Sequence, residues 1–411
     1  MNAPRVIHFA DLHIGIENYG GVHPETGVSL RVVDFLARLD EIVAFASENE
    51  TDLVVFAGDA FQHARPDPTL QRAFARRILQ LAEIAPVILL VGNHDIQANA
   101  AKASSVDIYS TLNVPNVIVA ESYAVLPIET RRGPVIVGTA PYPIRARLLE
   151  ADAALKSMRE INDFLQQTVT DALDKLAEEA DAIAGAAPRL LLGHFTVGGS
   201  KIGSERTRLL GTDESISLGV LADPRWDYVA LGHIHRFQDL TAGREGVPPV
   251  VYSGSLERVD FGEEGQEKGF CYVTLARNAA RYEFVEVNAR PLITLEVDCR
   301  AADNPTAEVI NQAKSKRLEQ AIVRLRVKLT QINRSLLDER DIRAKLKGLG
   351  VHHVAAFETD VERADRVRTG ASPEGLTHEE LLRRFFAQKG TSSADVEALV
   401  SLARAFMEDP D

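Results

Sequence analysis

The sequence predicts a layered α/β fold with a mixed sheet, and three observations support that prediction. Strand-like and helix-like segments alternate over about the first 290 residues. Five apolar runs of strand length each end on residue types that bind metals. The later strand-like runs alternate apolar and polar residues, as antiparallel strands do, so the sheet should contain both strand directions.

The five apolar runs share one pattern, in which a short β-branched stretch ends on aspartate, asparagine or histidine. They are residues 5–9, 53–56, 87–91, 190–192 and 228–231. The polar residues that follow them are Asp11, His13, Asp59, Asn93, His94, Asp95, His194, His233 and His235. Open α/β sheets bind ligands outside the carboxyl ends of their strands, so we expect these side chains to meet in one crevice.

Helices are predicted where apolar residues recur at helical spacing. Residues 31–47 form one such segment, and residues 68–82 form another through Leu70, Phe74, Ile78 and Leu81. Residues 145–183 form a longer stretch of one or two helices. Further strands are expected at residues 135–138, 250–252, 270–275 and 281–285.

Composition limits the class of protein. With 411 residues, 45% of them hydrophobic, the chain is long enough for two or three domains. It contains no apolar stretch of membrane-spanning length and begins without a signal-like apolar region, so we expect no membrane association. Cys271 and Cys299 are the two cysteines, which argues against a disulfide framework or a cysteine zinc site. These features favour the reducing cytoplasm.

Charge is distributed unevenly along the chain. The formal net charge of −13 gives no bulk attraction to nucleic acid, so DNA binding requires a local basic patch. Residues 301–350 are such a region, because they hold 11 lysines and arginines against 6 aspartates and glutamates. A solvated, charged helix face would explain the same composition.

The composition changes after Arg290, which indicates further domains. Residues 1–290 form the first domain, and residues 291–361 form a small β-α-β-α-β unit. Its expected strands and helices, in chain order, are residues 292–297, 306–320, 321–329, 339–347 and 351–357. Residues 362–375 are a linker rich in charge, glycine and proline, and residues 376–411 form a helical hairpin.

The hairpin carries an apolar stripe on each helix. Thr377 and Glu380 form a capping-box pattern at the start of the first helix. The stripe residues are Leu381, Leu382, Phe385, Phe386, Val396, Leu399, Val400, Ala403 and Phe406. Either the hairpin docks onto the rest of this chain, or a groove on a partner protein receives it.

The polar residues at the strand ends point to a two-metal hydrolase. Carboxylate, carboxamide and imidazole without thiolate suit Mn²⁺, Fe²⁺ or Zn²⁺. The seven expected ligands, too many for one such ion, are Asp11, His13, Asp59, Asn93, His194, His233 and His235. They divide well between two ions that share Asp59. Paired ions clamp the attacking and leaving oxygens of a phosphoryl displacement and generate a hydroxide nucleophile.

His94 has a separate expected role beside those ligands. It follows Asn93 directly and should project into the same pocket, where a histidine not bound to metal can protonate the leaving oxygen. Asp95 is expected to orient it through a hydrogen bond. The alternative is that His94 merely caps its loop.

The motifs together resemble those of the calcineurin-like metallophosphoesterase superfamily. The resemblance rests on Asp11-x-His13, Gly58-Asp59, Gly92-Asn93-His94-Asp95, Gly193-His194 and Gly232-His233-x-His235. Within it, the chain is most similar to the SbcD and Mre-type DNA repair nucleases. The motifs of that branch are residues 9–15, 58–61 with 65–66, 232–235, and 252–258 with 260–263.

The resemblance implies a two-sheet core flanked by helices, a small α/β capping domain and a terminal hairpin that docks an SbcC-type ATPase. It implies one metal held by Asp11, His13, Asp59 and His235. It implies a second held by Asp59, Asn93, His194 and His233. The metal would be Mn²⁺. The reaction would be ATP-linked double-strand exonuclease and single-strand or hairpin endonuclease cleavage, in DNA double-strand break repair and recombination.

Some features are specific to this chain. Gln62 stands where some relatives have an active-site histidine or aspartate, and the imidazole follows at His63, which we expect to act from behind the ligands. DNA contacts are expected from Arg324, Arg326 and Lys328. The homodimer that the resemblance implies would use residues 68–82 and 105–112, although internal packing explains their apolar residues equally well.

Two other functions fit parts of the pattern. A phosphatase or cyclic-nucleotide phosphodiesterase would use the same metal chemistry, but residues 252–258 and the last 120 or so residues argue against it. A non-catalytic scaffold for the ATPase is the other possibility. The complete set of ligand residue types argues against that one.

Overall fold

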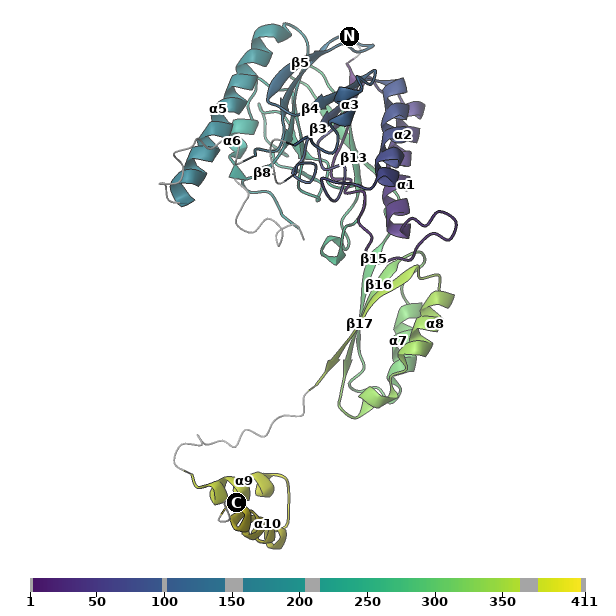
Figure 1. The fold of residues 1–411 in the computed structure, drawn as a ribbon, viewed down its shortest axis with the longest axis vertical. Helices are drawn as coiled ribbons and strands as arrows, with labels where there is room; N and C mark the ends of the chain where they lie inside the picture. Colours follow the sequence, from purple (N-terminus) through teal and green to yellow (C-terminus); the bar gives the residue numbers. More distant parts are fainter. Residues whose placement is uncertain (1–2, 98–101, 145–157, 204–214, 363–375, 408–411) are drawn as a thin grey trace. The chain divides into compact units, whose positions relative to one another are not determined.

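The protein is described by a computed structural model covering residues 3–97, 102–144, 158–203, 215–362 and 376–407 (Figure 1). Its chain falls into two compact units. The first comprises Met1–Leu295, Ala313–Leu325 and Arg343–Phe357, and the second comprises Glu296–Gln312, Arg326–Ile342 and Glu358–Asp411. The segment expected as one capping domain therefore contributes residues to both units, and the domain boundaries given above stay a prediction.

Two six-stranded sheets form the centre of the first unit. The first has the order β14 (Arg281–Glu286), β13 (Gly269–Thr274), β1 (Arg5–Phe9), β2 (Leu53–Phe56), β3 (Val87–Leu90), β4 (Val117–Ala120). The second has the order β11 (Gln238–Asp239), β12 (Val250–Tyr252), β10 (Tyr228–Gly232), β7 (Arg189–His194), β6 (Val135–Ala140), β5 (Ala124–Ile128).

Both sheets are mixed. Strands β1 to β4 run parallel, whereas β13 is antiparallel to β1 and to β14. In the second sheet β6, β7, β10 and β12 run parallel, whereas β5 and β11 are antiparallel edge strands. The predicted mixed, two-sheet α/β core is confirmed.

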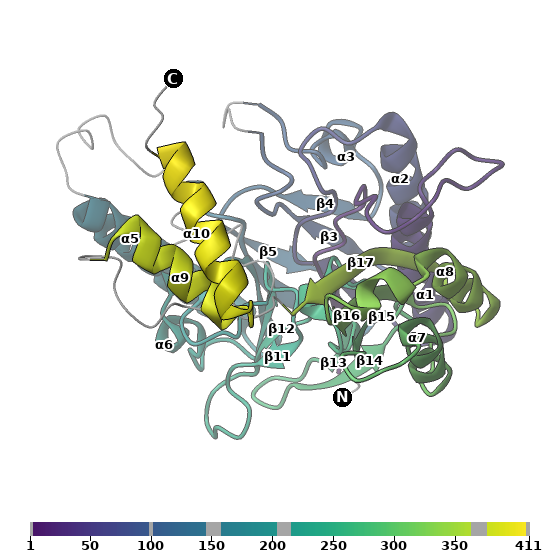
Figure 2. The same cartoon turned by 90° about the horizontal axis from the view of Figure 1, so that it is seen from below.

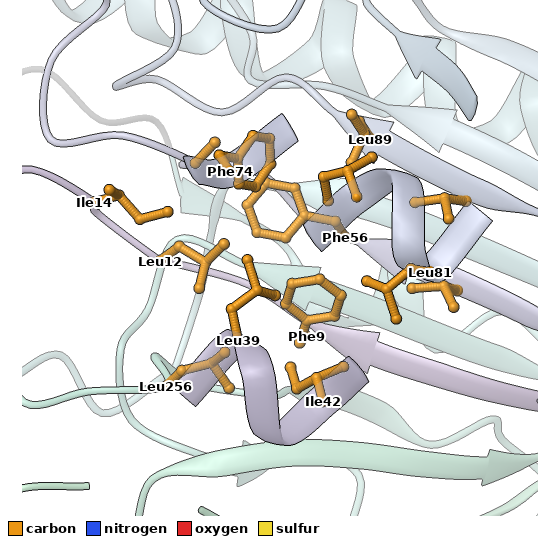
Figure 3. Close-up of a cluster of buried hydrophobic side chains, with 14 of the residues drawn as sticks. Phe9, Leu12, Ile14, Leu39, Ile42, Phe56, Phe74, Leu81, Leu89 and Leu256 are labelled. Carbon is orange, nitrogen blue, oxygen red and sulfur yellow. The ribbon is translucent and has the colours of Figure 1, made fainter. Parts of the chain in front are cut away.

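Helices α1 (Leu30–Glu48) and α2 (Pro68–Ile84) cover the outer face of the first sheet. Each begins on a capping side chain, since Ser29 accepts from the Arg31 amide and Asp67 accepts from the Thr69 amide. Figure 3 shows the resulting core, in which Leu39 and Leu81 of the two helices lie around Phe9 of β1.

A third helix and a second core layer complete the first unit. Helix α5 (Met158–Ala184) buries Leu173, Leu176 and Ala180 against the second sheet. A further apolar layer, which includes Val55, Leu192 and Ala230, fills the space between the two sheets. The layers therefore follow the order helix, sheet, sheet, helix, and both views place α5 opposite α1 and α2 (Figures 1 and 2). The start of the predicted long helix, residues 145–157, lies outside the described residues.

Short elements connect the larger ones. They are α3 (Ile108–Thr111), β8 (Thr196–Val197), β9 (Ser215–Ile216), α6 (Leu218–Leu221) and the 3₁₀ turn η3 (Phe261–Glu263). The η3 turn belongs to the motif of residues 260–263 noted in the sequence, and it begins where Asp260 accepts from the Gly262 amide at 2.7 Å.

A three-stranded sheet follows residue 291, in the order β15 (Leu292–Asp298), β16 (Ile322–Leu329), β17 (His353–Val361). Its helices are α7 (Pro305–Lys314) and α8 (Glu339–Gly348), with the 3₁₀ turn η4 (Asn333–Leu336) between β16 and α8. The helix expected over residues 306–320 ends early. After Lys314 the chain turns, and Gln320 adopts left-handed backbone with φ of 58°.

The terminal hairpin consists of α9 (His378–Gln388) and α10 (Ser393–Met407), which pack against each other (Figure 2). The predicted capping box at Thr377 and Glu380 is confirmed. Arg383 pairs with Glu397 at 2.9 Å across the two helices. Residues 363–375 of the expected linker lie outside the described residues. No described helix is both long and apolar enough to cross a membrane.

Candidate metal centre

The polar residues predicted at five strand ends converge on one site. Strands β1, β2 and β3 of the first sheet and β7 and β10 of the second deliver them. The donor atoms of three residue sets lie within 4.8 Å of one another: Asp11, His13 and His235; His13, Asp59 and His94; Asp59, His194 and His233. The site therefore spans both sheets, which explains why no single sheet carries all of its ligands.

One half of the site brings two imidazoles face to face. The Nε2 atoms of His13 and His235 lie 2.9 Å apart. The Oδ2 atom of Asp59 lies 3.6 Å from His13 Nε2. His13 Nδ1 is buried and has no hydrogen-bond partner among the described residues. Lone pairs that converge in this way, with a buried nitrogen unsatisfied, fit a divalent cation better than a network of hydrogen bonds.

The other half is built around Asn93. Its Oδ1 atom lies 3.0 Å from His194 Nε2 and 2.9 Å from His233 Nδ1. The Oδ2 atom of Asp59 is 3.5 Å from His194 Nε2, so the same carboxylate oxygen faces both halves of the site. That geometry fits a carboxylate shared between two ions.

The backbone beneath the site is strained. Asp11, His13, Asp59 and His233 have φ angles of 52°, 45°, 63° and 93°. Left-handed backbone is uncommon for residues other than glycine and costs on the order of 1–3 kcal/mol each. Hydrogen bonds between the loops hold it in place, because the Asp11 amide donates to the Gly58 carbonyl at 3.0 Å. Strain concentrated in this way is typical of a functional site.

Two glycines allow the loops to approach each other. A Cβ atom on Gly92 would lie 2.2 Å from the Oδ1 atom of Asp59, and one on Gly58 would lie 2.5 Å from His194 Nδ1. Gly58 also adopts a φ of +97°. The glycines before Asp59 and Asn93 are therefore required by close packing around the donor atoms.

His94 is half-buried beside the two groups, and its ring lies 4.7 Å from that of His13. Its amide donates to Asp59 Oδ1 at 2.8 Å, and its Nδ1 lies 2.8 Å from the Gln62 carbonyl oxygen. The expectation that Asp95 orients this ring through a hydrogen bond is corrected here. The contact that orients the His94 ring comes from a backbone carbonyl of the neighbouring loop.

Asp95 has another structural task. Its buried carboxylate accepts from the amides of Asp59 at 2.9 Å and Gly92 at 3.1 Å, and from the Ser105 hydroxyl at 2.8 Å. These bonds fasten the loop after β3 to the loop after β2. Asp95 thus acts on His94 only by positioning the loop that carries it.

The charges of the site are tightly balanced. Burial would raise the pKa of Asp59, yet the neighbouring histidines, above all His194, hold it well below its ordinary value. Burial would lower the pKa of His194, but the carboxylates of Asp59 and Asp11 outweigh it and raise that pKa to about 9. Burial lowers the pKa of His13 well below its ordinary value. Without an ion, a proton on His194 therefore offsets part of the carboxylate charge.

Residues behind the donors fix their ring orientations. His194 Nδ1 lies 2.6 Å from the Ala57 carbonyl oxygen, which leaves its Nε2 toward the site. His235 Nδ1 lies 2.7 Å from Oε1 of the buried Glu263. Sequence reasoning quoted Glu263 within a motif but gave it no role. A carboxylate at the end of that motif was the one signal available.

The remaining predicted residues lie apart from the donor cluster. His63 is exposed, and no described residue hydrogen-bonds to it. Arg324, Arg326 and Lys328 alternate along β16 and so share one face of that strand. The Arg324 guanidinium lies 4.4 Å from the centre of the Phe261 ring, and Arg326 pairs with Glu358 at 2.8 Å.

Comparisons with known proteins agree with this geometry. Residues 4–237 match the family model described as calcineurin-like phosphoesterase. The chain is 23% identical to the SbcD component of nuclease SbcCD from Bacillus subtilis (strain 168) over 407 residues, which is 97% of this chain and 96% of that protein. A dimetal phosphatase from Danio rerio aligns with 70% of this chain and 97% of its own, at 14% identity and a TM-score of 0.40. The family match covers more than half of the sequence, and the chain belongs to the calcineurin-like phosphoesterase family.

Proposed function

We propose that this chain is the nuclease component of an SbcCD-type complex and hydrolyses DNA phosphodiesters with two divalent ions. The observation that carries the proposal is the pair of donor groups that share Asp59. The likeness to the SbcD component of nuclease SbcCD along almost the whole chain supports DNA as the substrate. Double-strand break repair and recombination are the corresponding processes.

In this proposal Asp11, His13, Asp59 and His235 hold one ion. Asp59, Asn93, His194 and His233 hold the other. Two bound ions, for which we propose Mn²⁺, supply Lewis-acid activation of the phosphodiester and of a water molecule. The protein residues set where that chemistry occurs, because the strained loops fix the donor atoms before the substrate arrives.

His94 acts as the proton donor to the leaving oxygen. Its Nδ1 lies at the Gln62 carbonyl oxygen, which can only accept, so Nδ1 carries a hydrogen and Nε2 is the atom left for proton exchange. Its amide bond to Asp59 Oδ1 ties the ring to the carboxylate shared by both ions. Proton donation by a positioned side chain contributes about 10²–10⁴-fold to rate.

The proposed partner is an SbcC-type ATPase, bound through the terminal hairpin. After α9 and α10 pack together, Phe385 remains 45% exposed and Leu402 59% exposed. An amphipathic helix pair with exposed apolar residues fits a hydrophobic groove on another protein. A homodimer through α2 and α3 is proposed as well, since Leu79 and Ile108 stay exposed on those helices.

The test compares two kinds of substrate under the same Mn²⁺ conditions. Linear duplex and hairpin DNA should be cut in a metal-dependent manner, and chelation should abolish the cleavage. Aryl phosphate esters report whether the metal centre is active at all. Turnover of small phosphates by a protein that leaves every DNA substrate intact would favour a phosphatase or cyclic-nucleotide phosphodiesterase. Metal binding without any hydrolysis would favour a scaffold.

A further inference from the structure

A buried ion pair stands directly behind one of the proposed ligands. Glu263 ends the η3 turn, and its Oε2 atom lies 2.7 Å from Nζ of Lys268. Both side chains have no solvent exposure. Removing two charges from water costs about as much free energy as their attraction regains, so such a pair stabilises a fold little by itself. Its presence therefore calls for another explanation.

The carboxylate of Glu263 reaches the imidazole of His235. Oε1 lies 2.7 Å from Nδ1, and the opposite ring nitrogen, Nε2, lies 2.9 Å from His13 Nε2. An ionised carboxylate can only accept a hydrogen bond, so Nδ1 carries the hydrogen. The lone pair of His235 is thereby fixed on Nε2, the atom that faces the donor cluster.

Lys268 holds the other side of the arrangement. Besides Glu263, its ammonium group donates to the Ser255 hydroxyl at 2.8 Å and to the carbonyl oxygen of His235 at 3.0 Å, and it lies 3.2 Å from Gln266 Oε1. The second Glu263 oxygen also accepts from the Val259 amide at 3.0 Å. One lysine thus fixes both the backbone of His235 and the carboxylate that orients its ring.

The support is unequal between the two halves of the site. His194 is oriented by the neutral carbonyl of Ala57, and His13 Nδ1 has no hydrogen-bond partner among the described residues. A carboxylate behind a ligating histidine raises the basicity of the ring more than a carbonyl does. The half of the site that contains His235 is therefore built to bind a cation more tightly.

We propose that Glu263 is a positioning residue that, anchored by Lys268, makes the metal position at His235 the tighter of the two. This inference rests on the two-ion function proposed above. It also gives a role to the motif at residues 252–258 and 260–263, which supplies Ser255 and Glu263 to the arrangement.

The test measures Mn²⁺ binding to the full-length protein by calorimetric titration, so that it needs no catalysis. The double variant Glu263→Gln with Lys268→Met removes the carboxylate without leaving a buried charge unpaired. We expect one of two Mn²⁺ positions to weaken by about 10–100-fold, the usual effect of losing such a partner, while the other is retained. Two positions bound as in the wild type, or loss of both, would overturn the proposal.

Controls separate positioning from general stability. Asp227→Asn alters a buried carboxylate that accepts from the Arg189 amide at 2.7 Å, at the end of β10 away from His233. This variant should unfold more easily yet bind both ions normally. If the double variant does not fold, Glu263→Asp carries the same test, because it keeps a charge for Lys268 but shortens the reach to His235. Wild-type protein that binds two Mn²⁺ but leaves DNA uncut would refute the proposed nuclease and leave the role of Glu263 standing.

Discussion

Asp59 illustrates how much a single residue of this site must do. Its Oδ2 atom faces His13 on one side and His194 on the other, and its backbone is left-handed. Its Oδ1 atom accepts from the amide of His94. Each of these contacts constrains the same side chain, so its position is set by both sheets together. Such over-determined residues are where a fold retains strain for the sake of function.

The role proposed for His94 predicts a substrate-dependent defect. His94→Asn should leave metal binding intact and reduce DNA cleavage by about 10²–10⁴-fold, because the proton donor is lost while every proposed ligand remains. An aryl phosphate with an acidic leaving group needs no proton, so its hydrolysis should fall far less. Equal losses on both substrates, measured as kcat with metal content checked, would argue against proton donation.

The raised pKa of His194 predicts pH-dependent metal binding. Below a pH of about 9 the residue is protonated in the metal-free protein, and it must lose that proton to become a ligand. Mn²⁺ affinity should therefore increase with pH, by up to about tenfold per unit between roughly pH 6.5 and 8. Titrations in buffers of different ionisation enthalpy should show proton release on binding. A pH-independent affinity without proton release would contradict this charge balance.

At the scale of elements, β1 is joined to the second sheet by a buried histidine. His8 Nδ1 lies 3.1 Å from the Tyr228 hydroxyl, and Nε2 lies 3.2 Å from the Leu231 carbonyl oxygen on β10. Burial lowers the pKa of His8 from 6.5 to about 3. The neutral ring thus helps to fix the spacing of the two sheets whose ends form the metal centre.

This buried histidine predicts acid sensitivity. The folded-state pKa lies below the unfolded value, so the stability it contributes is complete above pH 6.5 and is lost as the pH falls toward 3. At pH 5 the loss from this one group should be about 2 kcal/mol. Urea unfolding of the wild type and of His8→Gln between about pH 5 and 7 measures it. The variant should lose less stability on acidification, and parallel pH curves would show that His8 does not titrate as described.

The strand ends of the site could be predicted from the sequence because each apolar run stops on a donor residue. Other elements carried weaker signals. The edge strand β5 contains Pro127, which argues against a strand unless the residue lies at an edge. The hydrogen bond between His94 and Gln62 uses a backbone carbonyl, which no residue type marks. The contact between Glu263 and His235 joins residues 28 positions apart, so only the folded chain reveals it.

At the scale of the whole molecule, charge and interaction surfaces are separated along the chain. The net charge is −13, whereas the basic residues of β16 lie on a single face. The exposed apolar residues of α9 and α10 lie in a different segment from the donor cluster. Catalysis, nucleic-acid contact and partner binding are therefore expected to be separable by mutation.

Deletion of residues 376–411 tests that separation. The shortened chain should no longer co-purify with a co-expressed SbcC-type ATPase, because the proposed docking helices are absent. Its Mn²⁺-dependent hydrolysis of aryl phosphates should remain, since no residue of the metal centre lies in the hairpin. Replacing Phe385 and Leu402 with serine is the matched, milder variant. Continued co-purification after the deletion would assign the contact to another surface.

The central claim is that five strand ends from two sheets hold a pair of ions around one carboxylate. Anomalous scattering from a crystal soaked in Mn²⁺ tests it most directly, because it reports the number, spacing and ligands of the ions together. The account predicts two peaks about 3.5–4 Å apart, with Asp59 between them. A single peak, or two ions that share no Asp59 oxygen, would contradict it.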